Sequence, residues 1–320
     1  MVKAIEVSGL TKAYDGIAAV SDINFSVEEG EVFGFLGPNG AGKTTTIRML
    51  TGLSKPTAGS ARVLGYDIAS EIIKAKKAFG VVPEQSNMYD ELSGLGNLIF
   101  MGQLYGIPRS EHRIRAEELL KTFGLFERKD SKFAAYSRGM KRALTIAASL
   151  VHKPRLLFLD EPTVGLDVVA ARSLRARIKQ LKESGITVFL TTHYLEEADM
   201  LCDRIALLVK GKVVAIDTPA RLKAMAEEKP ALEFSFKTSL PNAADELGRR
   251  LPGLAVVKVD DRIRIYGGDA DVLLHAILDY ANEKGTQVAS VSSLKPSLED
   301  AFVKLTGLSP MVMLADKGGR

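Results

Sequence analysis

The sequence contains a single cysteine, Cys202, among its 320 residues. One cysteine cannot form an internal disulfide or supply a cysteine-based zinc site, so we expect a reducing compartment. No stretch of about 18 apolar residues exists, and such a stretch is what a membrane-spanning helix requires. We also expect no secretory signal, because residues 2–7 already alternate like a strand. These absences predict a cytoplasmic protein.

Charge of one sign is not in marked excess. The chain has 43 basic and 39 acidic residues and a net charge of +4. This excess is too small and too dispersed to indicate a nucleic-acid partner. The hydrophobic fraction of 46% and the charged fraction of 26% are typical of a folded protein rather than a disordered one. A length of 320 residues favours two domains.

Short apolar runs alternate with helix-length segments over the first part of the chain. Runs without polar alternation are typical of strands that are buried on both faces of a sheet. The sequence therefore predicts an α/β core of parallel strands joined by right-handed crossovers. The predicted strands are residues 31–36, 156–160, 186–192 and 204–209, with a hairpin at 210–212, and the predicted helices include 45–50, 168–183 and 195–202.

Two regions depart from this alternation. Residues 87–150 have mostly helical patterns, which predicts a helical subdomain inserted in the core. Beyond a linker at residues 229–230, the predicted order strand-helix-strand-strand-helix-strand is typical of a ferredoxin-like module. We expect a first domain over residues 1–228, an accessory α+β domain over 229–308 with a last helix at 297–305, and a tail over 309–320.

A glycine-rich loop at residues 37–44 matches G-x-x-x-x-G-K-[ST] and lies between a predicted strand and a predicted helix, as a phosphate loop requires. The glycines let amide N–H groups point inward around an anion, and the helix N-terminus adds its positive dipole end. Lys43 is expected at the β and γ phosphates, and the Thr44 hydroxyl is expected to ligate Mg²⁺. Kinases, GTPases and motor ATPases share this loop. The expected nucleotide-binding residues are Gly37, Pro38, Asn39, Gly40, Ala41, Gly42, Lys43, Thr44 and Thr45.

Two carboxylates follow the apolar run 156–159. The carboxyl end of a parallel strand is where ligands bind in open α/β sheets, so Asp160 is expected in the Mg²⁺ shell. Glu161 lies one residue further and is expected to be free to polarise the attacking water. A solvated acidic pair at a strand end is the alternative, and the phosphate loop disfavours it.

Four weaker features occur in a fixed order around these motifs, and together they resemble the nucleotide-binding subunit of an ATP-binding cassette (ABC) transporter over residues 2–225. Tyr14 is similar to the aromatic residue that stacks on adenine. Gln85 is similar to the glutamine that touches Mg²⁺ and the attacking water. Asp167 lies in a run that resembles the loop crossing the dimer interface. His193 resembles the switch histidine that contacts the γ phosphate.

The family signature Leu-Ser-Gly-Gly-Gln is similar to Tyr-Ser-Arg-Gly-Met at residues 136–140. The resemblance assigns the Ser137 hydroxyl and the Gly139 amide to the γ phosphate. The apolar run 143–151 predicts a helix here, with Ser137 as a cap near its start. Arg138 departs from the pattern. It either hinders close approach of the backbone or adds charge near the phosphates or the subunit interface.

The resemblance implies that one chain holds two different half-sites. Two head-to-tail chains, as a homodimer or a heterodimer with a related cassette, would complete two sites around ATP and Mg²⁺. Because the sequence has no membrane span, transport implies a separate membrane permease. The chain is then expected to be peripheral on the cytoplasmic face of the cell membrane, with no nucleic-acid partner.

Residues 231–307 resemble the accessory domain of daunorubicin-resistance-type ABC-2 ATPases, which implies an exporter of a drug, ion or lipid-like substrate. This segment has no cluster of chemically active side chains, so a dimerisation or regulatory module is favoured over a small-molecule site. Importers remain a rival within the family. A translation- or DNA-associated ABC ATPase is the alternative from another class, and a phosphate-loop kinase, which would not need Ser137 or His193, is a third.

Overall fold

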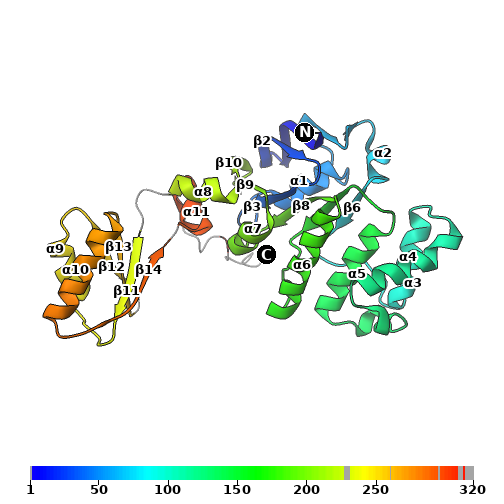
Figure 1. Cartoon of the computed structure of the whole chain (residues 1–320). Coiled ribbons are helices and arrows are strands. Elements are labelled where there is room, and N and C mark those ends of the chain that lie inside the picture. The colour runs from blue at the N-terminus through cyan, green and yellow to red at the C-terminus, as the bar shows by residue number, and fades with distance from the viewer. Residues whose placement is uncertain (1, 227–230, 260, 295, 309–312, 314–320) are drawn as a thin grey trace. The chain divides into compact units, whose positions relative to one another are not determined.

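The computed structural model describes residues 2–226, 231–259, 261–294, 296–308 and 313 (Figure 1). The chain divides into two compact units. One comprises Met1–Pro219 and Thr306–Arg320, and the other comprises Ala220–Leu305. Among the described residues, no helix has the length and apolar character needed to cross a membrane.

A six-stranded sheet forms the centre of the first unit. Its order is β10 (Lys212–Asp217), β9 (Arg204–Val209), β3 (Val32–Leu36), β8 (Thr187–Thr192), β7 (Leu156–Asp160), β6 (Phe79–Val82). The strands from β9 to β6 pair in parallel, and β10 pairs with β9 as an antiparallel hairpin. Every residue of β3, β7 and β8 is buried, as expected for strands covered on both faces. The predicted α/β core is confirmed.

Helices α1 (Lys43–Leu50), α2 (Ile72–Lys76), α6 (Val168–Glu183) and α7 (Leu195–Leu201) accompany this sheet. The bounds of α6 agree with the prediction. Helix α1 begins two residues before its predicted start because Gly42 is already its N-cap, with a left-handed φ of 105°. The lysine and threonine that end the phosphate loop therefore lie in the first turn of a helix.

An antiparallel sheet completes the α/β part of this unit, in the order β2 (Ile17–Glu28), β1 (Lys3–Tyr14), β4 (Ala58–Val63), β5 (Tyr66–Asp67). Phe25 of β2 packs against Phe33 and Phe35 of β3 and Phe189 of β8, with ring centroids 5.3 to 6.0 Å apart. This aromatic cluster joins the two sheets into one hydrophobic core.

The inserted region contains α3 (Gly94–Leu104), α4 (Arg109–Thr122), two short 3-10 helices, η1 (Phe126–Arg128) and η2 (Phe133–Ala135), and α5 (Arg138–Leu150). Residues 87–93 are not helical, so the predicted helical segment starts too early. Ser93 ends this stretch as the N-cap of α3, where its Oγ atom accepts a hydrogen bond from Gly96 N at 3.0 Å. Ser137 caps α5 in the same way, as predicted.

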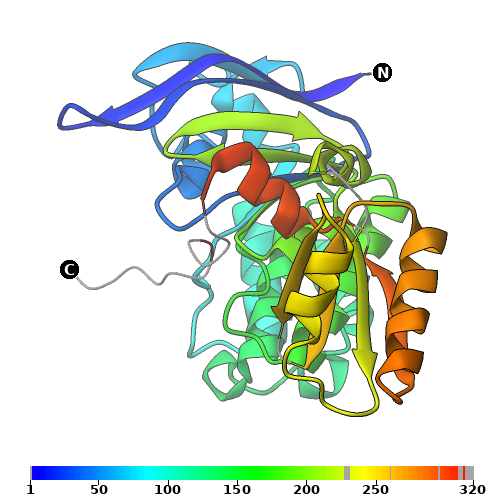
Figure 2. The same ribbon diagram turned by 90° about the vertical axis from the view of Figure 1, so that its left-hand side faces the viewer.

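The second unit contains an antiparallel sheet in the order β12 (Ala255–Val259), β13 (Arg262–Tyr266), β11 (Ala231–Phe236), β14 (Val288–Leu294). Helices α9 (Ala243–Arg250) and α10 (Ala270–Glu283) pack on one face of this sheet (Figure 2). Leu247 and Ile277 of these helices share a buried hydrophobic cluster with Phe234. This is the ferredoxin-like order that the sequence predicts. Helices α8 (Pro219–Ala226) and α11 (Leu298–Thr306) also belong to this unit, except for their end residues Pro219 and Thr306, which fall in the first unit. The expected linker at 229–230 and the tail at 309–320, apart from residue 313, lie outside the described residues.

Candidate nucleotide-binding site

The phosphate loop connects β3 to α1 and packs closely against neighbouring backbone. Gly40 and Gly42 have φ angles of 79° and 105°, in the left-handed region that favours glycine. A Cβ atom at Gly37 would lie 2.2 Å from the carbonyl oxygen of Leu208, and one at Gly42 would lie 2.6 Å from that of Ala19. The loop therefore needs glycine at these positions for its shape. That shape leads directly into the N-terminus of α1, which favours an anion.

Lys43 extends across its own loop and is only 6% exposed. Its Nζ atom donates to the carbonyl oxygens of Gly37 at 2.6 Å and Pro38 at 3.1 Å. The same atom lies 3.0 Å from Glu161 Oε1. The ammonium group thus connects the phosphate loop to the carboxylate that follows β7.

Asp160 is the last residue of β7 and faces the start of α1. Its Oδ1 atom accepts hydrogen bonds from Thr191 Oγ1 at 2.6 Å and from Thr44 Oγ1 at 3.3 Å. A hydroxyl and a carboxylate oxygen, which are hard oxygen donors of the kind Mg²⁺ prefers, therefore meet beside the phosphate loop. The sequence predicted this pair, and the parallel register of β7 and β8 adds Thr191 to it.

Glu161 adopts a φ of 46°, which is uncommon for a residue with a side chain. Its amide donates to Thr191 Oγ1 at 3.0 Å, and this bond helps to hold the backbone in that conformation. His193 Nδ1 lies 2.9 Å from Glu161 Oε2. The sequence analysis expected a free carboxylate at Glu161. The structure differs, because Lys43 and His193 each contact one of its oxygens.

The Glu161 carboxylate is ionised in this setting. Burial raises the pKa of its carboxyl, but the hydrogen bond with His193 and the charge of Lys43 outweigh burial and hold the pKa below its usual range. An ionised carboxylate that is buried beside the phosphate loop and held by a histidine is a candidate proton acceptor because of its position.

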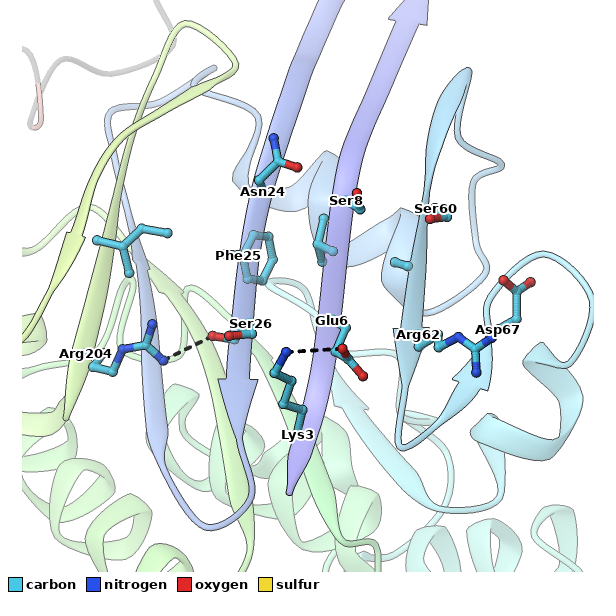
Figure 3. Close-up of a pocket in the computed structure, with 13 residues that line it drawn as sticks. Lys3, Glu6, Ser8, Asn24, Phe25, Ser26, Ser60, Arg62, Asp67 and Arg204 are labelled. Atoms are coloured by element: carbon cyan, nitrogen blue, oxygen red, sulfur yellow. Dashed lines mark hydrogen bonds and ion pairs between the residues drawn. The ribbon is translucent and has the colours of Figure 1, made fainter. Parts of the chain in front are cut away.

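Glu161 and His193 line a cavity of about 580 Å³, together with loop residues 39–45, Arg48 and Glu84. A second cavity, shown in Figure 3, has about 670 Å³ and lies along the antiparallel sheet, where Lys3, Glu6 and Arg204 line it. That second cavity contains none of the residues predicted to bind nucleotide. The sequence motifs therefore identify the cavity at the sheet's carboxyl edge as the candidate site.

Gly37, Pro38 and Asp160 belong to the loop and the strand end beside this cavity but are not among the residues that line it. Tyr14 and Gln85 do not line it either. Tyr14 is 44% exposed, and Lys12 Nζ lies 4.8 Å from the centre of its ring. Gln85 is exposed in the irregular segment after β6, whereas its neighbour Glu84 does line the cavity.

The signature residues line a different cavity, of about 540 Å³, between α5 and α6. Ser137 Oγ accepts from Met140 N at 3.3 Å, and Asp167 Oδ1 accepts from Ala170 N at 2.8 Å, so the two residues cap the two helices. Gly139 also lines this cavity. One chain thus presents phosphate-loop residues and signature residues in two separate places.

Sequence analysis missed two buried charged residues near the site. Arg142 on α5 donates to backbone carbonyl oxygens around Asp160 and Glu161. Glu197 on α7 is fully buried, and its Oε1 atom lies 3.6 Å from Arg175 Nε. In the sequence, Arg142 stands directly before the apolar run 143–151. A charged residue in that place is normally interpreted as the polar end of the run.

Comparison with known families matches residues 20–164 to the ABC transporter family. The linearmycin resistance ATP-binding protein LnrL of Bacillus subtilis (strain 168) is 37% identical over 310 residues, which cover 95% of this chain and 98% of LnrL. The daunorubicin/doxorubicin resistance ATP-binding protein DrrA of Streptomyces peucetius is 46% identical over 308 residues, covering 95% and 93% of the two chains. This chain belongs to the ABC transporter family.

Solved structures of ABC proteins share its fold. An ATP-binding subunit of an ABC transporter is 33% identical, with a TM-score of 0.63, and the match covers 69% of this chain and 92% of that subunit. The ATP-binding cassette MJ0796, solved as a dimer in a post-hydrolysis state with ADP and Pi, is 27% identical, with a TM-score of 0.62 and coverage of 67% and 98%. The chain is thus an ATP-hydrolysing, nucleotide-binding subunit of an ABC exporter.

Proposed function

We propose that this ABC ATPase works as a head-to-tail dimer, in which each ATP is held by the phosphate loop of one chain and the signature of the other. The observation that carries this proposal is the separation of the two residue sets. Lys43 and Glu161 line one cavity, whereas Ser137 and Gly139 line another. Head-to-tail association under a two-fold axis makes both sites equal. A homodimer is the simplest such assembly for one chain.

The phosphate loop holds the triphosphate in this proposal. Backbone amides and the N-terminus of α1 meet the phosphate oxygens, and Lys43 exchanges its carbonyl partners for the β and γ phosphates. Thr44 and Asp160 supply the oxygen donors for Mg²⁺, whose chemistry is to neutralise developing charge on the phosphates. Tyr14 offers an exposed ring for adenine.

Glu161 is the proposed proton acceptor for the attacking water. Its lowered pKa keeps the carboxylate charged near neutral pH, and His193 orients it through the bond to Oε2. Contact between His193 and the γ phosphate would connect the orientation of Glu161 to the presence of substrate. Gln85 is proposed to reach the water and Mg²⁺ in the assembled dimer.

Transport by this subunit requires a membrane partner. We propose a separate permease that docks near the inserted helices, with the ATPase peripheral on the cytoplasmic face of the cell membrane. The names of LnrL and DrrA refer to resistance to linearmycin and to daunorubicin or doxorubicin, which favours an antibiotic-like substrate among the drug, ion and lipid-like classes. The ferredoxin-like domain, proposed over residues 229–308, then serves dimerisation or regulation.

The test is ATP-dependent dimerisation of a Glu161→Gln variant, measured by light scattering with Mg²⁺ and ATP at saturation. Gln keeps the shape of the side chain and removes the proton acceptor, so we expect a stable dimer that does not hydrolyse ATP. The same variant with Lys43→Ala is the control and should stay monomeric. A Glu161→Gln chain that binds ATP and remains monomeric contradicts the head-to-tail proposal.

A further inference from the structure

We infer that Arg142 is a positioning residue, which couples the signature end of α5 to the carboxylate loop of its own chain. This inference rests on the proposed function, because it concerns how two ATP sites communicate. Arg142 lies five residues after Ser137 on the same helix. Its guanidinium donates to backbone carbonyl oxygens and not to Ser137 or Gly139, the signature residues proposed to contact phosphate. Its role is therefore to act through the backbone.

All five N–H donors of the Arg142 guanidinium find backbone carbonyl oxygens. Nε donates to Pro162 at 2.9 Å. Nη2 donates to Asp160 at 2.7 Å and to Glu161 at 3.1 Å. Nη1 donates to Glu84 at 3.2 Å and also to Pro83. A guanidinium has five N–H groups in a fixed planar arrangement, so this side chain is saturated and its orientation is determined.

The guanidinium is a buried cation whose hydrogen bonds all go to neutral groups. The side chain is 7% exposed. Burial lowers the pKa of Arg142 to about 10, while nearby carboxylates, led by Asp160 and Glu84, oppose that shift. The group therefore carries its charge at neutral pH, and hydrogen bonds from a charged donor are stronger than neutral ones. Such a group holds its acceptors more firmly than turn hydrogen bonds do.

The acceptors belong to two segments that the proposed mechanism uses. Pro83 and Glu84 directly precede Gln85, and residues 160–162 carry both Asp160 and Glu161. One side chain thus joins three elements: helix α5, the segment after β6 and the loop after β7. A displacement of α5 moves both segments together, because the five bonds share one rigid plane.

Glu161 makes the catalytic loop sensitive to such a displacement. Its φ of 46° is a conformation that surrounding bonds must maintain, and Arg142 holds its carbonyl oxygen while Thr191 holds its amide. Engagement of the signature by the partner's nucleotide would shift α5, and Arg142 would pass that shift to the carboxylate beside the chain's own nucleotide. Arg142 thereby links one ATP site to the other.

The experiment compares Arg142→Met and Arg142→Lys with the neighbouring control Lys141→Met. Lys141 lies on the same helix and pairs with Asp90 at 3.3 Å, away from the five carbonyls. We expect Arg142→Met to lower kcat for ATP hydrolysis by about 100-fold, the effect of a small misplacement at a reacting centre, with KM changed less than about threefold. The Hill coefficient for ATP should fall to about 1. Arg142→Lys keeps at most three N–H donors, so its kcat and Hill coefficient should lie between those of wild type and Arg142→Met.

A purely structural role for Arg142 makes a different prediction. Activity would then fall only in proportion to the folded fraction, measured by circular dichroism and thermal unfolding. KM and the Hill coefficient would keep their wild-type values, and Arg142→Lys would not rank between wild type and Arg142→Met in kcat. Either that result or an unchanged kcat in Arg142→Met overturns the inference. If Arg142→Met does not fold, the lysine variant decides by the same measurements.

Hydrogen exchange separates this inference from the proposed function. In the Glu161→Gln chain, ATP should produce the dimer and protect amides in residues 84–87 and 160–163. Adding Arg142→Lys should leave the dimer and the protection of the phosphate loop intact, and it should remove the protection of both segments. Absence of the dimer contradicts the proposed function itself. A dimer with unchanged protection in the Arg142→Lys chain contradicts only the coupling.

Discussion

Lys43 and Glu161 form a buried ion pair, with Nζ and Oε1 3.0 Å apart and side-chain exposures of 6% and 7%. The pair joins the residue proposed to bind phosphate to the residue proposed to activate water. His193 Nδ1 lies 2.9 Å from the other oxygen, so both oxygens of the Glu161 carboxylate have a partner within the protein. When ATP binds, its phosphates would take the place of the Glu161 carboxylate as the anion beside Lys43.

Removing one partner of this pair should destabilise the chain. Lys43→Ala leaves a buried carboxylate with only His193 beside it, and we expect the free energy of unfolding to fall by about 3 kcal/mol. Adding Glu161→Gln to Lys43→Ala removes the uncompensated charge and should restore part of this loss. Urea unfolding of both single variants and the double variant measures the coupling. Strictly additive effects would show that the ion pair does not contribute to stability.

Glu197 should weaken the folded state near neutral pH. Burial raises the pKa of its carboxyl, and Thr192, Thr163 and Arg175 oppose this only in part. A carboxyl with raised pKa in the folded protein contributes stability that is full below its unfolded pKa and is lost as pH rises through its folded pKa. Glu197→Gln should therefore be at least as stable as wild type at pH 7, and its stability should fall less between pH 4 and pH 7.

The measurement for Glu197 is thermal unfolding at several pH values, with Glu196→Gln as the matched control. Glu196 is the adjacent residue on α7 and is exposed, so its substitution should leave the pH profile unchanged. A Glu197→Gln chain that is less stable than wild type at pH 7 by more than about 1 kcal/mol would mean that an ionised Glu197 is stabilised by Arg175.

Two glycine substitutions should separate ATP binding from dimerisation. In Gly37→Ala the new Cβ meets the backbone oxygen of Leu208 at 2.2 Å, so the phosphate loop must shift and ATP binding should be lost. In Gly139→Ala the new Cβ meets Ala170 Cβ at 2.9 Å, which moves the signature and not the loop. That variant should bind a fluorescent ATP analogue normally and fail to dimerise. Equal loss of ATP binding in both variants would refute the separation.

Arg138 should strengthen the contact between subunits. It occupies the first turn of α5, where the helix dipole disfavours a cation, so an anion supplied by the partner's nucleotide is its natural counterpart. In the Glu161→Gln background, Arg138→Gln should weaken ATP-dependent dimerisation by about tenfold and reduce its salt dependence. Tighter dimerisation would instead indicate that Arg138 obstructs close approach, the other interpretation that the sequence allows.

Local patterns explain how much of this site the sequence predicts. The phosphate loop and Asp160 depend on neighbours within a few residues, and the structure places both at the edge of the sheet as expected. The contact of His193 with Glu161 depends instead on the register of β7 against β8, which no short motif specifies. The sequence does not predict the start of α1 at Lys43, because a glycine that caps a helix in the left-handed conformation cannot be told from a loop glycine by residue type alone.

Arg142 illustrates a further limit of sequence reasoning. Motif searches look for side chains that complement each other, and here every acceptor is a carbonyl oxygen that any residue type supplies. A buried arginine beside an apolar run is therefore indistinguishable in sequence from the polar end of that run. Burial and the geometry of the donors identify it only in three dimensions.

The use of backbone oxygens by Arg142 has a genetic consequence. A salt bridge between two side chains can be repaired after mutation by a complementary change in its partner. The five carbonyl acceptors around Arg142 offer no such partner, since substitution at residues 83, 84 or 160–162 leaves the oxygens in place. Second-site suppressors of an Arg142→Lys defect should therefore map to positions outside these five residues.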